Sequence, residues 1–359
     1  MAYTNIDDPS AYFQTATYTG AGANTEVTND GNSDLKPDFL WIKNRGAAYD
    51  HVVWDSNRNL GSATNAPLLK ANTTDAENST QNWWNATNNG INTDGFQFGS
   101  SQFFTMNYTS NTYVAWQWKA NGGTTASNTD GDINSTVQVN SDAGFSIVTY
   151  TGNFTGSQGV GHGLGVRPDV VIIKNRDTAT DWVVWTSELT SGNFLKLNAA
   201  DAQSSSSRIY QAGFTTSTFG IGANNSVNKS GDDLIAYCFA EKQGYSKFGK
   251  YVGNGSNTDG AFIYTGFKPA FIIAKRIDAA AHNWFMWDTK RAPFNLVEAV
   301  LKPNSSAAES TLFQIDILSN GFKHYNNYGS TNESGGEYIY MAFAENPFVT
   351  STGIPTTAR

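Results

Sequence analysis

The hydrophobic pattern of the chain consists of short apolar runs separated by stretches rich in Asn, Thr, Ser and Gly. Three of these runs begin at a proline and end at a lysine: Pro37–Lys43, Pro168–Lys174 and Pro269–Lys275. A Tyr-x-Gly step precedes each proline, and a tryptophan that closes a second apolar run follows it, both at nearly constant spacing. Because this order recurs three times, the sequence predicts three copies of one structural unit.

The apolar runs have the composition of strands. Val, Ile, Phe, Tyr and Trp fill them, Gly, Asn, Asp and Pro bound them, and helical periodicity is almost absent. Runs such as Val170–Ile173 do not alternate with polar residues, so both faces of these strands are expected to be covered, as inside a sandwich. The predicted fold class is all-β, with three tandem antiparallel β-sandwich modules of jelly-roll or lectin-like type.

The distance between the copies predicts how the chain divides. A unit of about 100 residues is long enough to have its own core, so we expect three modules that fold independently, and a chain that starts at Ser141 should keep the last two folded. The predicted boundaries are an arm at 1–10, module 1 at 11–120, a linker at 121–142, module 2 at 143–244, module 3 at 245–349 and a tail at 350–359. The linker is too polar to build a core, although one short strand fits its sequence.

Aromatic residues supply both core and contact candidates. The tryptophans of the second apolar runs are predicted core residues: Trp54, Trp185 and Trp287. A second group lies beside Asn and Thr residues and is a candidate for glycan or subunit contact: Trp83, Trp84, Tyr325 and Tyr328. Rings beside amide side chains stack on sugars in lectin sites, whereas packing against the module edge or a neighbouring chain is the alternative interpretation.

A cationic motif ends the proline-headed run in two copies. It reads Lys-Asn-Arg at Lys43–Arg45 and at Lys174–Arg176, whereas the third copy has Lys-Arg-Ile at Lys275–Ile277. One interpretation is strand termination with an ion pair to aspartates of the same module. The other is a repeated contact with an anion or a subunit. Either way, the motif separates the first two modules from the third.

Charge and composition argue against several classes of function. The net charge is −8 and no cluster of Lys and Arg occurs, which argues against nucleic-acid binding. No apolar stretch is long enough to cross a membrane, and the first residues carry no recognisable export signal. We therefore expect neither a nucleic-acid partner nor membrane insertion.

Candidate chemistry is sparse. The single cysteine, Cys238, excludes an internal disulfide and is predicted to be a buried, inert thiol. The four histidines are dispersed without metal-ligand spacing, so no metal or other cofactor is expected. Carboxylates are plentiful, but no pair can be assigned to acid–base catalysis from spacing alone. The expectation is a protein that is not an enzyme.

Several segments of the first two copies resemble a repeat found in structural proteins of tailed bacteriophages, especially phages of marine bacteria. The resemblance rests on Ala143–Asn153, Val160–Asp169 and Ile172–Arg176 in the second copy and on Pro37–Arg45 and Asn92–Phe96 in the first. It spans about residues 11–242 and is weaker in the third copy, where Ala270 replaces the aspartate that follows proline.

The resemblance implies a virion component without catalytic activity, in a tail fibre, a capsid fibre or decoration, or a related appendage. Its expected partners are other virion proteins and copies of itself in a homo-oligomer. The alternative is a lectin-like module of the particle that binds a glycan on the host surface. A polysaccharide depolymerase is a third hypothesis.

Overall fold

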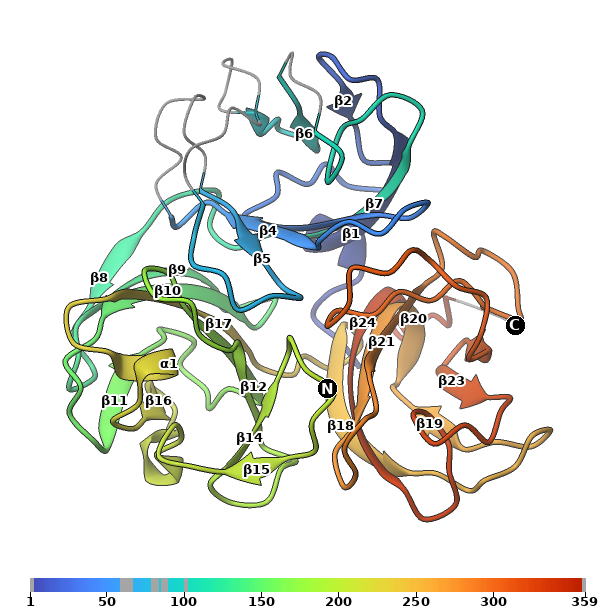
Figure 1. Ribbon diagram of the computed structural model, residues 1–359. Helices are drawn as coiled ribbons and strands as arrows, with labels where there is room; N and C mark the ends of the chain where they lie inside the picture. Colours follow the sequence, from blue (N-terminus) through green and yellow to red (C-terminus); the bar gives the residue numbers. More distant parts are fainter. Residues whose placement is uncertain (1–2, 59–66, 79–83, 85–89, 100–102, 357–359) are drawn as a thin grey trace.

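The computed structural model describes residues 3–58, 67–78, 84, 90–99 and 103–356. Antiparallel strands dominate the described residues, which confirms the all-β prediction. They form three lobes around a common centre, with the first sequence repeat at the top of Figure 1, the second at lower left and the third at lower right. The short helical turns of the described chain are η1 (Pro9–Ala11), η3 (Gln211–Gly213) and α1 (Asn225–Asn228).

The first repeat (residues 11–120) contains one larger and one smaller sheet. Its strands are β1 (Phe13–Thr19), β2 (Glu26–Val27), β3 (Phe39–Asn44), β4 (Val52–Asp55), β5 (Leu69–Lys70), β6 (Phe96–Gln97) and β7 (Thr112–Trp118). The larger sheet has the order β1-β7-β3-β4-β5, and the smaller sheet pairs β2 with β6.

The second repeat (residues 121–244) has the widest sheet. Its strands are β8 (Ala126–Asn128), β9 (Ser135–Asn140), β10 (Phe145–Thr151), β11 (Gln158–Gly161), β12 (Val170–Asn175), β13 (Val183–Thr186), β14 (Asn193–Lys196), β15 (Ser204–Ser205), β16 (Thr218–Ile221) and β17 (Asp233–Phe239). The larger sheet has the order β15-β14-β13-β12-β17-β10-β9-β8, and β11 pairs with β16. Residues 121–142 were predicted to be a linker, but β8 and β9 extend this sheet.

The third repeat (residues 245–349) again has two sheets. Its strands are β18 (Ser246–Val252), β19 (Phe262–Tyr264), β20 (Phe267–Arg276), β21 (Trp284–Asp288), β22 (Ile315–Leu318), β23 (Gly321–His324) and β24 (Glu337–Pro347). The larger sheet has the order β18-β24-β20-β21, and the smaller one has the order β19-β23-β22.

The three larger sheets share one register. In each, the last strand of the repeat lies between the strand with the Tyr-x-Gly step and the proline-headed strand. Trp118 thus pairs with Phe13 and Phe39, Phe239 with Phe145 and Val170, and Phe343 with Ser246 and Phe271. These registers define which residues of the three repeats occupy equivalent positions.

Each repeat has an apolar cluster between its larger and smaller sheets. Trp54, Trp185 and Trp287 lie in these clusters and are at most 1% exposed. The indole of Trp287 donates a hydrogen bond to the Phe313 carbonyl at 2.9 Å, and that of Trp185 to the Gln211 side chain at 3.2 Å. Burying an indole contributes a large apolar area, so these tryptophans anchor the outer half of each repeat.

A fourth cluster lies at the centre of the molecule and takes residues from all three repeats. The equivalent rings of Trp118, Phe239 and Phe343 contact one another there, with centroid distances of 5.4, 5.8 and 6.5 Å. The proline-headed strands are therefore covered on both faces, as their apolar runs predict. The second cover, however, is the neighbouring repeats rather than a sheet of the same repeat.

Candidate functional site

The contacts between repeats are the most distinctive constellation in the described chain, and they follow one backbone pattern. An amide of one repeat donates to a carbonyl just after the proline-headed strand of the next, as Glu77 to Arg176 at 2.7 Å and Glu309 to Arg45 at 2.8 Å. Gln203 donates to Ile277 in the same way at 2.9 Å. One backbone hydrogen bond is therefore common to the three contacts.

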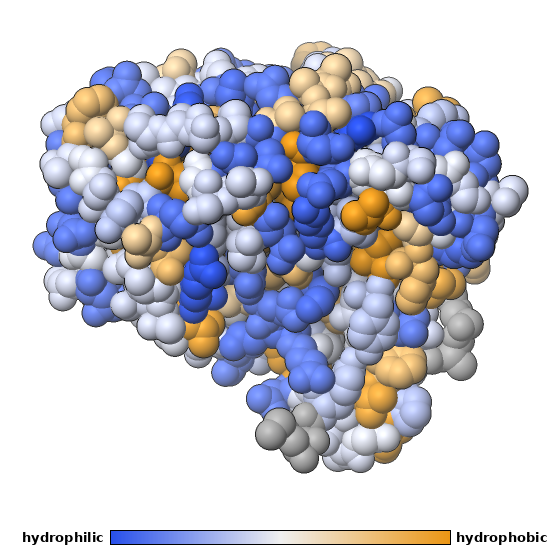
Figure 2. All heavy atoms as spheres, turned by 90° about the horizontal axis from the view of Figure 1, so that it is seen from below, coloured by the Kyte–Doolittle hydropathy of each residue, from blue (hydrophilic) through white to orange (hydrophobic). Residues whose placement is uncertain are grey.

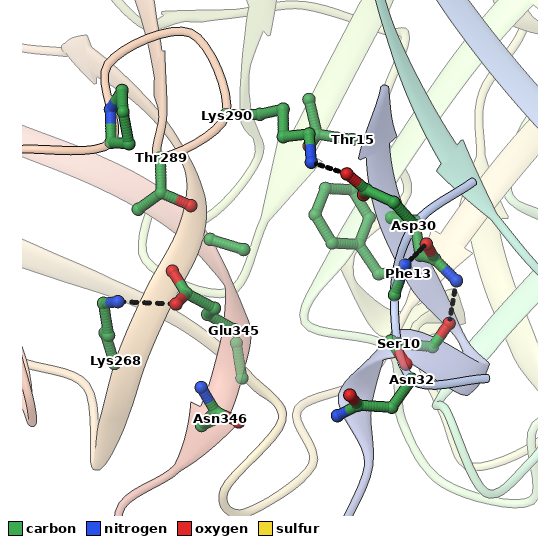
Figure 3. Close-up of a pocket in the computed structure, with 15 residues that line it drawn as sticks. Ser10, Phe13, Thr15, Asp30, Asn32, Lys268, Thr289, Lys290, Glu345 and Asn346 are labelled. Atoms are coloured by element: carbon green, nitrogen blue, oxygen red, sulfur yellow. Dashed lines mark hydrogen bonds and ion pairs between the residues drawn. The ribbon is translucent and has the colours of Figure 1, made fainter. Parts of the chain in front are cut away.

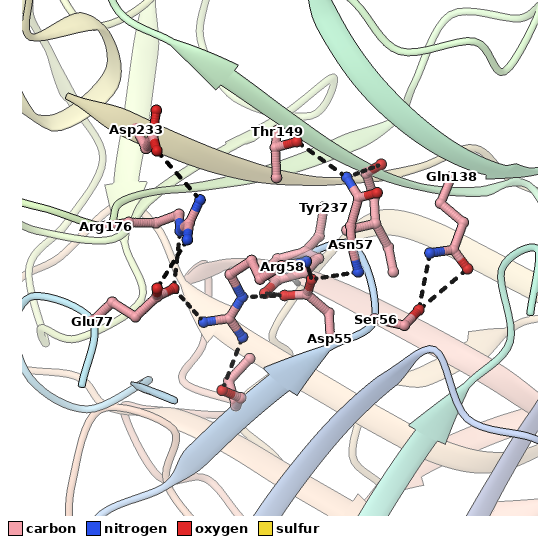
Figure 4. A network of polar contacts seen from close by, with 12 residues as sticks. Asp55, Ser56, Asn57, Arg58, Glu77, Gln138, Thr149, Arg176, Asp233 and Tyr237 are labelled. Carbon is pink, nitrogen blue, oxygen red and sulfur yellow. Dashed lines mark hydrogen bonds and ion pairs between the residues drawn. The ribbon is translucent and has the colours of Figure 1, made fainter. Parts of the chain in front are cut away.

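The contact between the first and second repeats holds a buried ionic network (Figure 4). Arg58 contacts Asp55 at 2.6 Å and Glu77 at 2.9 Å, and the Arg58 and Asp55 side chains are fully buried. Arg176 of the second repeat donates to both oxygens of Glu77 at 2.9 Å. The Tyr237 hydroxyl donates to Asp55 at 2.6 Å, and burial together with that carboxylate raises the tyrosine pKa well above its usual value.

An equivalent network, made of other residues, lies in the contact between the third repeat and the first. Arg291 contacts Asp288 at 2.6 Å and Glu309 at 3.0 Å, and Arg45 contacts Glu309 at 2.8 Å. Trp116, equivalent to Tyr237, donates its indole N–H to Asp288 at 3.0 Å. Burial opposes ionisation of Glu309, but hydrogen bonds and charge from Arg45 and Arg291 lower its pKa overall.

The contact between the second and third repeats has no such network. The residues at the equivalent positions are Thr186, Leu189, Gln203, Ile277 and Met341. Leu189, Ile277 and Met341 belong to the central apolar cluster. Every charged member of the network is thus replaced by a neutral residue on both sides of this contact.

These contacts match neither of the two interpretations of the Lys-Asn-Arg motif completely. The arginine pairs mainly with a glutamate of another repeat, and Arg176 reaches Asp233 of its own repeat only at 3.8 Å. The asparagine caps a turn, since the Asn44 side chain accepts from the amides of Gly46 and Ala47 at 3.0 Å. The motif therefore joins repeats within one chain.

The lysine of the motif is buried in all three repeats. Lys43, Lys174 and Lys275 are fully buried and donate to backbone carbonyls, such as Thr74 of the first repeat at 3.0 Å from Lys174. Burial lowers the pKa of each ammonium group from 10.5 to about 8, despite distant carboxylates that act in the opposite direction. All three repeats therefore bury a lysine whose charged form is destabilised by burial.

A groove of about 540 Å³ opens between the first and third repeats (Figure 3). Phe13, Gln14 and Thr15 of β1 form one side, and Ala270, Ala344 and neighbouring residues of the third repeat form the other. Lys290 forms an ion pair with Asp30 across the groove. The groove is lined by both polar and apolar groups of two repeats.

The aromatic candidates for glycan or subunit contact differ in how far their side chains are exposed. Trp83 lies outside the described residues. Trp84 is only 3% exposed and stacks on Phe98 with a centroid distance of 5.4 Å, which agrees with the packing alternative and not with a sugar-stacking ring. Tyr325 is half-buried beside Lys323, and Tyr328 is 47% exposed with its ring against Phe313.

Sequence analysis missed two exposed rings on the smaller sheet of the third repeat. Phe262 and Tyr264 of β19 are 49% and 53% exposed, whereas Ile263 between them is 5% exposed. Lys323 lies opposite Phe262 on β23. The alternation of aromatic residues around a single isoleucine carried this signal, because alternate residues of a strand face opposite sides.

The described residues offer neither a metal site nor a membrane-spanning helix. They contain no group of three or more His, Cys, Asp and Glu residues arranged to hold a metal ion. None of the helices in the described ranges is long and apolar enough to span a membrane. Cys238 is buried, and burial raises the pKa of its thiol.

Comparison with known proteins identifies a family but no function. The model of DUF7483, a domain of unknown function, matches residues 8–347 as one unit. The chain therefore belongs to this family. No curated protein and no solved structure matches the chain.

Proposed function

We propose that the chain is a non-enzymatic structural protein of bacteriophage particles, in a tail fibre, a capsid fibre or decoration, or a related appendage. It consists of three tandem antiparallel β-sandwich modules and acts through surfaces that bind other virion proteins and further copies of itself. Its place is the virion, and it uses no cofactor. The proposal combines the resemblance of the first two repeats to phage structural repeats with the way in which the three repeats join.

The observation that supports this function most is the closure of three repeats on one aromatic centre. Trp118, Phe239 and Phe343 meet there, and buried ionic networks lock two of the three contacts. A body held by both its core and its contacts resists relative motion of its lobes. Such rigidity suits a protein that presents fixed surfaces to partners.

The surface is compatible with this role. The face seen from below carries small, separate apolar patches within a mostly polar surface (Figure 2). Surfaces of this kind form contacts through complementary shape and scattered anchors rather than through one large apolar area. The net charge of −8 also favours solubility before assembly.

The test is the presence and copy number of the protein in purified particles of a phage that encodes it. Quantitative mass spectrometry should find it in fixed stoichiometry with the major capsid or tail protein, and antibody labelling should place it on one part of the particle. Its absence from particles, with abundant protein in the infected cell, would overturn the proposal.

A second candidate function is recognition of a host glycan, and the outer sheet of the third repeat favours it. Phe262 and Tyr264 expose their rings there, and Lys323 lies beside the Tyr325 ring at 5.6 Å. Aromatic faces next to charged groups bind sugars by stacking and hydrogen bonding. On a glycan array, binding should disappear in Phe262→Ala and Tyr264→Ala and persist in Phe154→Ala, a matched change at a ring that is 48% exposed on the second repeat.

A further inference from the structure

We propose that the groove between the first and third repeats binds an extended strand supplied by a different polypeptide chain. This inference rests on the assembly function proposed above and names the kind of partner that one assembly surface takes. The second repeat supports it, because this repeat has a strand of its own at the equivalent place.

The groove borders an open sheet edge. Among the described strands, β1 is paired with β7 alone and lies at the edge of its sheet. Gly20 donates to the Asn111 carbonyl at 2.9 Å and Lys119 to the Tyr12 carbonyl at 3.0 Å, which fixes the phase of the β1–β7 ladder. In an antiparallel pair, the backbone N–H and C=O groups of successive residues point alternately toward the partner strand and away from it. Phe13, Thr15 and Thr17 therefore direct these groups away from β7. The Thr15 hydroxyl is also buried without a hydrogen-bond partner among the described residues.

In the second repeat the equivalent edge is covered. β10 corresponds to β1, and β9 pairs with it so that Phe145, Ile147 and Thr149 face Asn140, Gln138 and Thr136. These three residues of β10 are the equivalents of Phe13, Thr15 and Thr17. An added strand at this edge is therefore compatible with the fold of the repeat.

β9 also fills the contact between its own repeat and the first one. The Gln138 side chain accepts from the amides of Asn121 at 3.1 Å and Gly123 at 2.8 Å and donates to the Ser56 hydroxyl at 2.9 Å. Asn57 donates to the Thr136 carbonyl at 3.0 Å. The strand thus offers amide side chains at alternate positions to a polar surface of the neighbouring repeat.

The groove displays the equivalent surface of the third repeat. The residues of the first repeat around β9 include Ser56, Asn57, Lys119, Ala120 and Asn121. By register their equivalents are Thr289, Lys290, Ala344, Glu345 and Asn346, and all five line the groove. The groove therefore combines an unpaired strand edge with the surface that holds β9 elsewhere in the molecule.

The described segments nearest the groove do not supply the strand. The residues between Tyr3 and β1 are bound elsewhere, since Tyr3 donates to the Gly266 carbonyl at 2.6 Å, and Asp7 accepts from the Ser351 amide at 2.6 Å. The β9 strand of a second copy is already paired on both edges, with β8 and β10. An extended segment of a partner protein, with Gln or Asn at alternate positions, matches both the edge and the surface by β-strand addition.

The test uses a labelled synthetic peptide with the sequence of residues 133–141, Ile-Asn-Ser-Thr-Val-Gln-Val-Asn-Ser, and the full-length protein. Saturable binding is expected by fluorescence anisotropy, with slowed amide hydrogen exchange in β1. N-methylation of the peptide at Thr136 and Gln138 blocks the two amides that face the edge and should weaken binding about tenfold or more. N-methylation at Val137 and Val139, whose amides face away, should leave binding within about twofold.

Two variants of the protein complete the test. Thr289→Trp places a large ring in the groove and should abolish binding. Thr289→Val removes only the hydroxyl equivalent to that of Ser56, the partner of Gln138, and should weaken binding about fivefold or more without a bulky change. Absence of peptide binding, equal loss with both N-methylated peptides, or exchange protection away from β1 would overturn the groove assignment. Particles that contain the protein while the peptide fails to bind would overturn this inference alone, and peptide binding by a protein absent from particles would overturn the virion function alone.

Discussion

The contact between the first and second repeats has charged side chains at the positions where the contact between the second and third repeats has neutral ones. Both place one backbone hydrogen bond beside the same end of the proline-headed strand. The first surrounds it with Asp55, Arg58, Glu77 and Arg176, and the second with Thr186, Leu189, Gln203 and Ile277. An equivalent backbone hydrogen bond therefore does not require equivalent side-chain chemistry.

The difference shows that the network changes as a set. A buried charge that loses its partner keeps its desolvation cost without the attraction that offset it. An apolar residue in place of one member would leave such a charge, whereas replacement of all members leaves none. The third repeat departs at Ile277 where the first two have arginine, and Gln203 stands where Glu77 and Glu309 stand elsewhere.

Removing the first repeat is expected to have the largest effect on the contacts between repeats. A chain that begins at Ser141 loses Trp118 and its neighbours, so the rings of Phe239 and Phe343 lose their cover at the centre. The sequence predicts that the last two repeats stay folded, but the shared centre predicts loss of cooperative unfolding. Thermal melting followed by near-UV circular dichroism, with the full chain as control, decides between them.

The largest effect of a single substitution is expected inside the ionic contact. Arg58→Met leaves Asp55 buried and unpaired and should lower the free energy of unfolding by about 3–5 kcal/mol. The matched control is Leu189→Met at the equivalent apolar position, with an expected loss below about 1.5 kcal/mol. Denaturant unfolding measures both, and similar losses would contradict the distinction between the two contacts.

The buried lysines test a feature that all three repeats share. In the folded state the pKa of Lys43, Lys174 and Lys275 is about 8, so between pH 8 and the unfolded value of 10.5 the unfolded chain binds more protons. Stability should therefore rise with pH above 8, by about 1.5 kcal/mol per lysine up to pH 9.5. Lys174→Met should remove its share of the slope in urea denaturation, and a flat profile of the parent would contradict the assignment.

A combined variant gives the contact between the first and second repeats the neutral residues of the contact between the second and third. The variant combines Asp55→Thr, Arg58→Leu, Glu77→Gln, Arg176→Ile and Tyr237→Met. Its stability should lie within about 1 kcal/mol of the parent, or above it, because no buried charge is left unpaired. Urea denaturation measures the change, and a loss as large as that of Arg58→Met alone would mean that the network stabilises the contact directly.

The smallest effect is expected at the rim of the groove. The Lys290–Asp30 pair is partly exposed on both sides, so Asp30→Asn should change the free energy of unfolding by less than about 1 kcal/mol. Thermal melting at low and high salt measures it, and salt should reduce the difference further. A larger loss would place this pair among the structural contacts, together with the buried networks.

The sequence was sufficient to predict the repeat order, the strands and the burial of Trp54, Trp185 and Trp287, because alternation and apolar runs report whether a face is covered. The departure of the third repeat at Ile277 was also visible in it. The folded structure was needed to show which neighbour covers each face. It placed β9 in the second sheet, buried Trp84, and brought Glu77 to Arg176 across the boundary between repeats. A periodic pattern records burial along the chain, whereas the identity of the partner depends on how sheets far apart in sequence close around one centre.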